Sequence, residues 1–314
     1  MNKDLDIAAQ TILDGNLVAF PTETVFGLGA DATNNTACTK IFTLKNRPSV
    51  NPLIVHVDNK ASAEKFAVLD TDKGEKLIEA FWPGPLTIVV PLKENSNIAP
   101  SVLGENNTVA IRMPSHNIAL ELIRRSGRPI AAPSANPSGY ISSTSSAHVL
   151  RHFAKNDVFI VAANSCKYGL ESTIVDLTTP MITILRHGFI TAEAIEKVLG
   201  EHVGVHDENL DIIKSPGMLN KHYSPYVKVR LNAGFLSENE IGLNLGDSEL
   251  LSNYSLNLSR CGNLIEAAAN LYKMLRELDD YASIRNNTIA IAKIPEYGIG
   301  VAINDRIKRA ASST

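Results

Sequence analysis

The first two thirds of the chain alternate short apolar runs with stretches whose apolar residues recur at helical spacing. Asp4 to Asp14 shows this spacing, with Gly15 where a helix would stop, and Ile118 to Arg125 repeats it. The apolar runs predict strands at Leu17 to Phe20, Leu53 to Val57, Leu86 to Leu92, Val109 to Met113, Pro129 to Ala132, Val158 to Ala162, Ile174 to Leu177 and Ile182 to Leu185. Strands interleaved with helices predict an α/β fold in which helices cover a sheet.

A linker separates this region from a second, smaller unit. The apolar pattern weakens from Glu201 to Lys214, and turn residues follow at 215–217 and 222–225. Beyond them we expect a strand at Val227 to Leu231, an amphipathic helix around Leu264 to Leu278, a strand at Ile289 to Ala292 and a helix at Ala302 to Ala311. The 314 residues therefore divide into a first domain at 1–205, a linker at 206–226 and a small C-terminal α/β domain at 227–314.

Composition and charge narrow the class of protein. With 30 basic and 33 acidic side chains, the formal charge is −3, so no global basic field holds the chain on nucleic acid. Cys38, Cys166 and Cys261 are far apart and lack the spacing of a disulfide framework or a zinc site. No run approaches the roughly 18 apolar residues of a membrane span, and the first residues lack the pattern of a signal peptide. We expect an untargeted cytoplasmic protein with no membrane contact.

Two polar segments near strand ends are candidates for ligand binding. Pro21 to Gly27 directly follows the first strand, at the end where open α/β sheets bind ligands, although a structural turn is the alternative. Lys45 and Arg47 stand just before the next strand and suit one polyphosphate, as a point charge and a bidentate fork. A solvated basic turn would have the same sequence.

The segment from Ala132 to Gly139 carries the strongest signal. Its hydroxyls, its amide and its exposed backbone donors suit phosphate and ribose oxygens, and an Asx or Ser turn is the alternative. Arg112 and Arg186 each close a strand that is otherwise apolar. A buried arginine needs an anionic partner, which is either a structural carboxylate or a ligand phosphate.

The histidines predict no metal site. His148 and His152 are four residues apart on a predicted helix, but the residues between them lack the glutamate of a zinc protease. His56 interrupts a strand and points to one of its faces, as a core residue or as part of a site.

Taken together, these segments resemble the YrdC-like family over nearly the whole chain. The motifs are PTETVFGLGADA at 21–32, Lys45 and Arg47 before NPLIVHV at 51–57, FWPGPLTIVV at 81–90, VAIRMP at 109–114, APSANPSG at 132–139 and ESTIVD at 171–176. SPGMLNKHYSP at 215–225 and NDRIKRAA at 304–311 are similar to the long members, which carry an extra C-terminal domain. The resemblance implies a twisted open sheet with covering helices, and a Rossmann-like second domain.

The same resemblance implies a nucleotidyltransferase that makes L-threonylcarbamoyladenylate from L-threonine, bicarbonate or carbon dioxide, and ATP, with release of pyrophosphate. This is the first step of threonylcarbamoyladenosine formation in tRNA, and a downstream tRNA threonylcarbamoyl transferase would take the product. Magnesium would arrive with ATP, because the sequence shows no dedicated carboxylate cage.

The resemblance also assigns roles to single residues. The implied ATP-binding residues are Lys45, Arg47, Asn51, Ser134, Asn136, Ser172 and Arg186, with Lys45 and Arg47 as the catalytic pair. The implied threonine-binding residues are Thr22, Phe26, His56, Arg112 and Thr173. The family usually has tyrosine where this chain has Phe26. His222 and Tyr223 are candidates for a lid that excludes water from the carbamate.

Two other functions compete with this one. The first is a double-stranded RNA or tRNA binding protein without synthase activity, and weak RNA binding could also accompany the enzyme. Such binding needs several surface cations rather than a pocket of hydroxyls, amides and single arginines. The second is carbamoyl transfer for metal-centre assembly, but the acylphosphatase and zinc-finger modules of those proteins are missing from this sequence.

Overall fold

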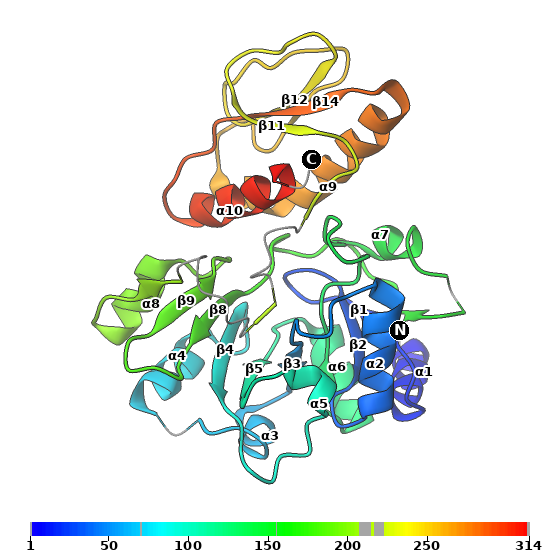
Figure 1. The fold of residues 1–314 in the computed structure, drawn as a ribbon, viewed down its shortest axis with the longest axis vertical. Coiled ribbons are helices and arrows are strands. Elements are labelled where there is room, and N and C mark those ends of the chain that lie inside the picture. The colour runs from blue at the N-terminus through cyan, green and yellow to red at the C-terminus, as the bar shows by residue number, and fades with distance from the viewer. Residues whose placement is uncertain (1, 70, 155, 207–214, 217–222, 313–314) are drawn as a thin grey trace.

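A ten-stranded sheet organises the first domain in the computed structural model, which describes residues 2–69, 71–154, 156–206, 215–216 and 223–312 (Figure 1). Its strands are β1 (Val18–Phe20), β2 (Gly27–Asp31), β3 (Ile54–His56), β4 (Leu86–Pro91), β5 (Thr108–Arg112), β6 (Ile130–Ala131), β7 (Phe159–Ile160), β8 (Thr173–Asp176), β9 (Thr183–Arg186) and β10 (Gly204–Val205). The helices that accompany them are α1 (Asn2–Leu13), α2 (Asn35–Lys45), α3 (Lys60–Glu64), α4 (Asp72–Phe81), α5 (Pro100–Leu103), α6 (Asn117–Ser126), α7 (Ser146–Leu150) and α8 (Ala192–Leu199).

The sheet is mixed and runs in the order β10-β9-β8-β4-β5-β3-β6-β2-β1-β7. The pairs β3–β5, β4–β8, β1–β7 and β9–β10 are parallel, whereas β1–β2, β2–β6, β3–β6, β4–β5 and β8–β9 are antiparallel. The α/β class predicted from the sequence, with an open sheet and covering helices, is therefore confirmed.

Alternation along β1 shows how the sheet separates its two faces. Val18 and Phe20 pack with α1 and α6, while Leu17 and Ala19 point the other way into the main core beside α2. In the centre of the sheet, strands β3, β4, β5, β8 and β9 contribute a small separate cluster: Ile54, Val89, Ala110, Ile174 and Leu185. This central part of the sheet lies under the second domain and carries the candidate site.

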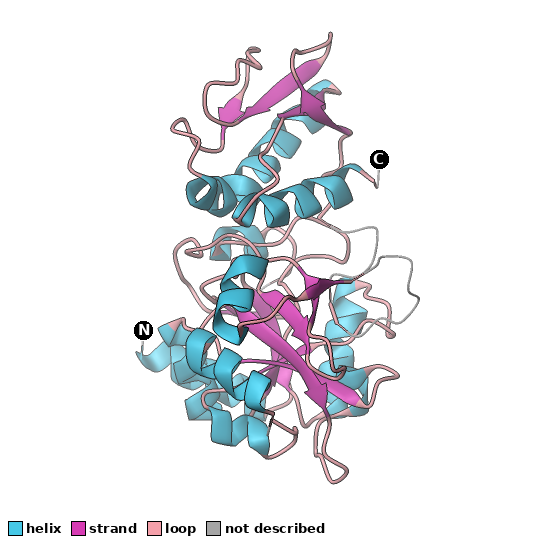
Figure 2. Cartoon of the chain, turned by 90° about the vertical axis from the view of Figure 1, so that its left-hand side faces the viewer, coloured by secondary structure: helices cyan, strands magenta, loops and turns pink. Residues whose placement is uncertain are grey.

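The second domain is a smaller α/β unit. Its strands β11 (Val229–Ala233), β12 (Glu240–Asn244), β13 (Leu256–Asn257) and β14 (Thr288–Ala292) form a wholly parallel sheet in the order β11-β14-β12-β13. Helices α9 (Leu264–Arg285) and α10 (Ile299–Ala311) lie between this sheet and the first domain (Figures 1 and 2). Asn263 begins α9 by accepting hydrogen bonds from the backbone N–H groups of Ile265 and Glu266.

Four strands, β2, β10, β12 and β13, were not predicted from the sequence. Gly27 and Gly29 in β2 suggest a loop, but a Cβ on Gly29 would lie 2.7 Å from the ring of Phe20, so glycine is needed there for packing. The second domain's β12 and β13 were also missed, because Gly242 interrupts β12 and only two residues of β13 pair.

The two domains share one apolar cluster. Val25, Tyr140, Ile141 and Leu170 of the first domain pack in the same buried cluster as Leu271, Leu275 and the other apolar residues of α9. Gly169, whose φ is +69°, allows the closest approach, because a Cβ there would lie 2.7 Å from the Ala268 carbonyl oxygen and the Ala269 Cα. The contact between the two domains is therefore part of a buried apolar core.

We expect Gly169→Ala to destabilise the protein by at least about 2 kcal/mol, because it adds a collision with the α9 backbone to the strain of a positive φ. The matched control is Gly200→Ala, since Gly200 has φ +74° and no atom within 4 Å of an added Cβ. The control substitution should lower the free energy of unfolding by about 1 kcal/mol, from backbone strain alone. The two free energies of unfolding are compared in urea titrations, and equal losses would contradict the steric explanation.

Candidate active site

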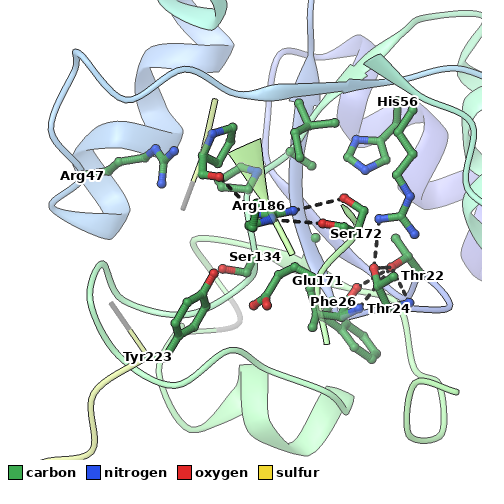
Figure 3. Close-up of a pocket in the computed structure, with 17 residues that line it drawn as sticks. Thr22, Thr24, Phe26, Arg47, His56, Ser134, Glu171, Ser172, Arg186 and Tyr223 are labelled. Carbon is green, nitrogen blue, oxygen red and sulfur yellow. Dashed lines mark hydrogen bonds between the residues drawn. The ribbon is translucent and has the colours of Figure 1, made fainter. Parts of the chain in front are cut away.

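A cavity opens over the central strands of the first sheet, where the linker meets it (Figure 3). It is lined by Thr22, Thr24, Val25, Phe26, Gly27, Arg47, Ile54, His56, Arg112, Ala132, Pro133, Ser134, Glu171, Ser172, Arg186, Pro216 and Tyr223. The free space is about 40 Å³, far below the roughly 300 Å³ or more of a ligand pocket. The walls therefore have to separate before a nucleotide can enter.

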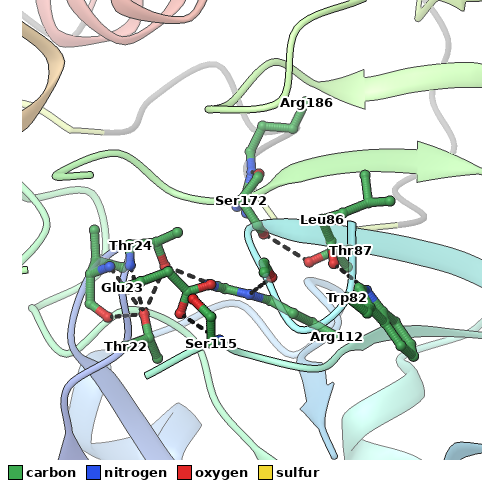
Figure 4. Close-up of polar contacts among 12 residues, drawn as sticks. Thr22, Glu23, Thr24, Trp82, Leu86, Thr87, Arg112, Ser115, Ser172 and Arg186 are labelled. Carbon is green, nitrogen blue, oxygen red and sulfur yellow. Dashed lines mark hydrogen bonds and ion pairs between the residues drawn. The ribbon is translucent and has the colours of Figure 1, made fainter. Parts of the chain in front are cut away.

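Arg112, at the end of β5, is held by three groups from two segments (Figure 4). Its Nη2 lies 2.6 Å from the Glu23 carboxylate, its Nη1 donates to the Thr24 hydroxyl at 2.9 Å, and its Nε donates to the Gly84 carbonyl at 3.1 Å. Burial raises the pKa of Glu23, but the charge and hydrogen bond of Arg112 outweigh it and hold the pKa below 4.5. Of the two partners the sequence left open, the structural carboxylate is present, and Arg112 still lines the cavity.

Arg186, at the end of β9, has neutral partners only in the described part of the chain. Its Nε and Nη2 donate to the carbonyl and hydroxyl oxygens of Ser172, at 3.1 and 3.0 Å, and its Nη1 donates to the Pro216 carbonyl at 3.2 Å. The Ser172 hydroxyl also lies 2.7 Å from the Thr87 hydroxyl (Figure 4). A buried guanidinium with uncharged partners attracts an anion strongly.

Lys45 is the last residue of α2, and Arg47 lies two residues after it. The two side chains face different surroundings. Arg47 lines the cavity, and its guanidinium donates to the carbonyls of Asn51 and Pro52 at 3.2 and 2.9 Å. The Lys45 ammonium lies under the loop at 132–139, where it donates to the carbonyls of Ser134, at 2.6 Å, and of Asn136. Burial, together with the neighbouring Arg47, lowers the pKa of Lys45 well below 10.5, and burial lowers that of Arg47 to about 9.

His56 is neutral in this site. Its Nδ1 lies 3.3 Å from the Ile130 carbonyl, which can only accept, so Nδ1 carries the proton and Nε2 is left as an acceptor. Burial and the nearby charge of Arg112 lower the pKa of His56 to about 3. The ring stands edge-on to Phe20, with centroids 6.0 Å apart.

Thr22 and Phe26 frame the same end of the cavity (Figure 3). The Thr22 hydroxyl lies 2.7 Å from both the Thr24 hydroxyl and the Val25 carbonyl oxygen, which closes the turn that follows β1. Phe26 is fully buried. The PTET segment is thus both a structural turn and a wall of the cavity.

Glu171 is the residue that the sequence analysis overlooked. Its Oε1 accepts from the Ser142 hydroxyl at 2.5 Å, and its Oε2 accepts from the Tyr272 hydroxyl at 2.8 Å and from the Arg306 Nε at 2.9 Å. Burial raises its pKa, but Arg306, Arg186 and the hydrogen bonds prevail and lower it to about 2. The only signal in the sequence was its place next to Ser172 in the ESTIVD motif.

The structure brings together most of the predicted site residues, with some exceptions. Thr22, Phe26, Arg47, His56, Arg112, Ser134, Ser172, Arg186 and Tyr223 line the cavity. Lys45, Asn51, Asn136 and Thr173 are buried near it without lining it. The Thr173 hydroxyl donates to the Ile190 carbonyl at 2.6 Å, and His222 lies outside the described residues.

Two buried side-chain oxygens stand out beside Lys45 and Arg47. Within the described residues, Oδ1 of Asn51 and Oδ1 of Asn136 have no hydrogen-bond partner, although both residues are about 1% exposed. A buried acceptor without a partner costs free energy, so each oxygen is ready to accept from a ligand once the walls separate.

Neither a metal-ligand cluster nor a membrane-spanning helix is present in the part of the chain that the structure describes. No group of three or more His, Cys, Asp or Glu side chains is arranged to hold a metal ion there. No helix within these ranges is long and apolar enough to cross a membrane.

Comparisons with known proteins agree along the whole chain. The family model described as "Telomere recombination" matches residues 10–188, and the model described as "Threonylcarbamoyl-AMP synthase, C-terminal domain" matches residues 190–312. The threonylcarbamoyl-AMP synthase of Pyrococcus abyssi is 39% identical over 97% of this chain and 93% of its own length. That of Bacillus subtilis is also 39% identical, over 97% of this chain and 92% of its own.

A solved structure shows the same architecture. The crystal structure of the Pyrococcus abyssi protein complexed with L-threonine superposes with a TM-score of 0.89 at 37% identity, over 98% of this chain and 94% of that one. Sequence motifs, fold and full-length relatives therefore lead to one conclusion: the chain belongs to the threonylcarbamoyl-AMP synthase family, in its long form with a C-terminal domain.

Proposed function

We propose that the chain joins L-threonine, bicarbonate or carbon dioxide, and ATP into L-threonylcarbamoyladenylate, with release of pyrophosphate. The observation that carries this proposal is the cavity itself, in which three buried arginines and several hydroxyls from distant segments converge. Full-length similarity to synthases supports it, as does the threonine complex of the Pyrococcus abyssi relative.

Threonine would bind at the end of the cavity formed by Thr22, His56 and Arg112. Three N–H groups of Arg112 are engaged by described residues, out of the five that a guanidinium has. The remaining two can meet the carboxylate of threonine. The Nε2 lone pair of His56 can accept from the threonine hydroxyl or ammonium, because the ring stays neutral.

ATP would bind at the opposite side, with its phosphates between Arg47 and Arg186. The threonine amine adds to carbon dioxide and loses a proton to solvent, which gives a carbamate, and a carbamate oxygen attacks the α-phosphorus. The bond to the bridging oxygen breaks as the new P–O bond forms, and pyrophosphate leaves. The chain's contribution is to position the reactants and to offset negative charge with fixed, desolvated cations. Lys45 contributes indirectly, because its ammonium donates to the Ser134 carbonyl and so fixes the loop at 132–139.

Magnesium would enter with ATP rather than reside on the protein. Glu171 is the one carboxylate among the described lining residues, and both of its oxygens already accept hydrogen bonds. The donor set therefore suits a metal ion bound through phosphate oxygens and water. The adenylate would pass to a downstream tRNA threonylcarbamoyl transferase. A reducing cytoplasm is part of the proposal, supported by the three free cysteines.

The linker would close the site. Pro216 and Tyr223 line the cavity, and the Pro216 carbonyl accepts from Arg186. A lid at this place would exclude water from the carbamate and the adenylate. The RNA-binding alternative has less support, because Arg47, Arg112 and Arg186 are each at most 7% exposed and cannot reach a phosphate backbone.

The function is tested by pyrophosphate release from ATP, magnesium and bicarbonate, with and without L-threonine, together with detection of the adenylate by mass spectrometry. We expect release to depend on threonine and the adenylate to be found. A folded protein that binds ATP but shows neither threonine dependence nor adenylate would contradict the proposal.

Arg112→Lys should raise the KM for threonine at least about tenfold and change the KM for ATP little. Lysine keeps a charge beside Glu23 but loses the fork that grips a carboxylate. Steady-state kinetics in both substrates provide the measurement. Arg128→Lys is the control, because Arg128 is half exposed and faces Asp31 away from the cavity, with 3.6 Å between Nε and Oδ2. Equal effects on the two KM values would argue against a threonine contact.

Tyr223→Ala should uncouple ATP consumption from product, because it removes a fully buried side chain from the cavity wall and admits water. The ratio of pyrophosphate released to adenylate formed is expected to rise above one. Tyr226→Ala is the matched control in the same segment, since Tyr226 is 72% exposed. An unchanged ratio for Tyr223→Ala would leave the linker without a role as a lid. Deleting the second domain would be a poorer test, because it would uncover Tyr140, Ile141 and Leu170.

A further inference from the structure

The wall of the cavity contains a carboxylate whose charge is balanced from the other domain. The Glu171 side chain is 7% exposed and that of its partner Arg306 is 0% exposed. Arg306 belongs to α10. Its Nη1 also pairs with the Asp305 carboxylate, and its Nη2 donates to the His187 carbonyl at 2.7 Å, next to Arg186 in the first domain. The pair is thus fully inside the protein, where charges interact strongly.

Arg186 is the cation of the first domain that competes for Glu171, because its charge, like that of Arg306, lowers the pKa of this carboxylate. Glu171 precedes Ser172, whose hydroxyl and carbonyl hold the Arg186 guanidinium, and Glu171 and Arg186 both line the cavity (Figure 3). Among the described residues, Glu171 forms its ion pair with Arg306, while the hydrogen-bond partners of Arg186 are neutral. The charge of Arg186 therefore stays available to a ligand.

We infer that Arg306 is a positioning residue for the synthase site: by serving as counter-ion to Glu171, it prevents this carboxylate from neutralising Arg186. The C-terminal domain thereby sets the affinity of the cavity for the phosphates of ATP. The inference rests on the proposed function, in which Arg186 contacts ATP.

A purely structural role for the pair gives different expectations. If Arg306 only joins the domains, its loss lowers stability, but the folded variants bind ATP as the wild type does, with or without a charge at Glu171. If Arg306 keeps Glu171 from pairing with Arg186, removing the charge of Glu171 restores the affinity for ATP, even though the contact between the domains stays weakened. The affinity of the folded variants for ATP separates these roles, whereas stability does not, because removing the unpaired charge of Glu171 restores stability in either case.

The experiment measures the dissociation constant of a non-hydrolysable ATP analogue with magnesium, by calorimetry on the full chain. Arg306→Gln should raise the constant roughly tenfold, within the usual range of coupling between sites. The double variant Glu171→Gln/Arg306→Gln should return to within about threefold of the wild type, because a neutral amide does not draw Arg186. Glu171→Gln alone should bind the analogue at least as tightly as the wild type.

Tyr140→Phe is the matched control for damage to the interface. The Tyr140 hydroxyl donates to the buried Asp279 carboxylate at 2.8 Å, across the same domain boundary but away from the cavity. It should leave the dissociation constant unchanged. If Arg306→Gln does not fold, Tyr272→Phe replaces it, because this variant keeps the ring and removes one hydrogen bond from Glu171.

The possible results are distinct. Repair of binding by Glu171→Gln in either background supports the inference. Folded variants in which Arg306→Gln binds like the wild type, or in which the double variant is no better than the single one, overturn it. A wild-type chain that binds no ATP analogue would instead refute the proposed function.

Discussion

The ion pair between Glu171 and Arg306 is the contact on which the arrangement of this protein depends. It joins the two domains, and it lies in the wall of the cavity at the same time. A buried pair of charges is costly unless hydrogen bonds satisfy the remaining atoms, and here Ser142, Tyr272 and the His187 carbonyl do so. The site and the domain interface are thus one electrostatic unit.

The cavity concentrates cations where water is scarce. Arg47, Arg112 and Arg186 are all buried, and carbonyl or hydroxyl oxygens fix each guanidinium in place. Such fixed donors need little reorganisation when a negatively charged ligand arrives, which is the main source of catalytic stabilisation in many enzymes. The free energy needed to hold these cations apart from solvent comes from the packing of the surrounding sheet and second domain.

The sequence was sufficient for the class of fold and for most residues of the cavity. Apolar alternation indicated β1, β3, β4 and β5, and the polar segments after them indicated which strand ends carry the site. The glycines of β2 concealed a strand, because their reason is the space taken by Phe20. Glu171 and Arg306 are 135 residues apart, so only the fold reveals that they meet. The predicted role of Thr173 in binding threonine stays a prediction, and its hydroxyl donates to the Ile190 carbonyl.

The apolar cluster that the two domains share has a consequence for folding during synthesis on the ribosome. The first sheet ends at Val205, but its partner helix α9 is complete only at Arg285. Those intervening residues, about 80 of them, take roughly 4 to 16 s to synthesise at the usual rate. During that interval Val25, Tyr140, Ile141 and Leu170 have no cover from the second domain. The nascent first domain thus exposes an apolar surface, of the kind that chaperones bind, until the chain is complete.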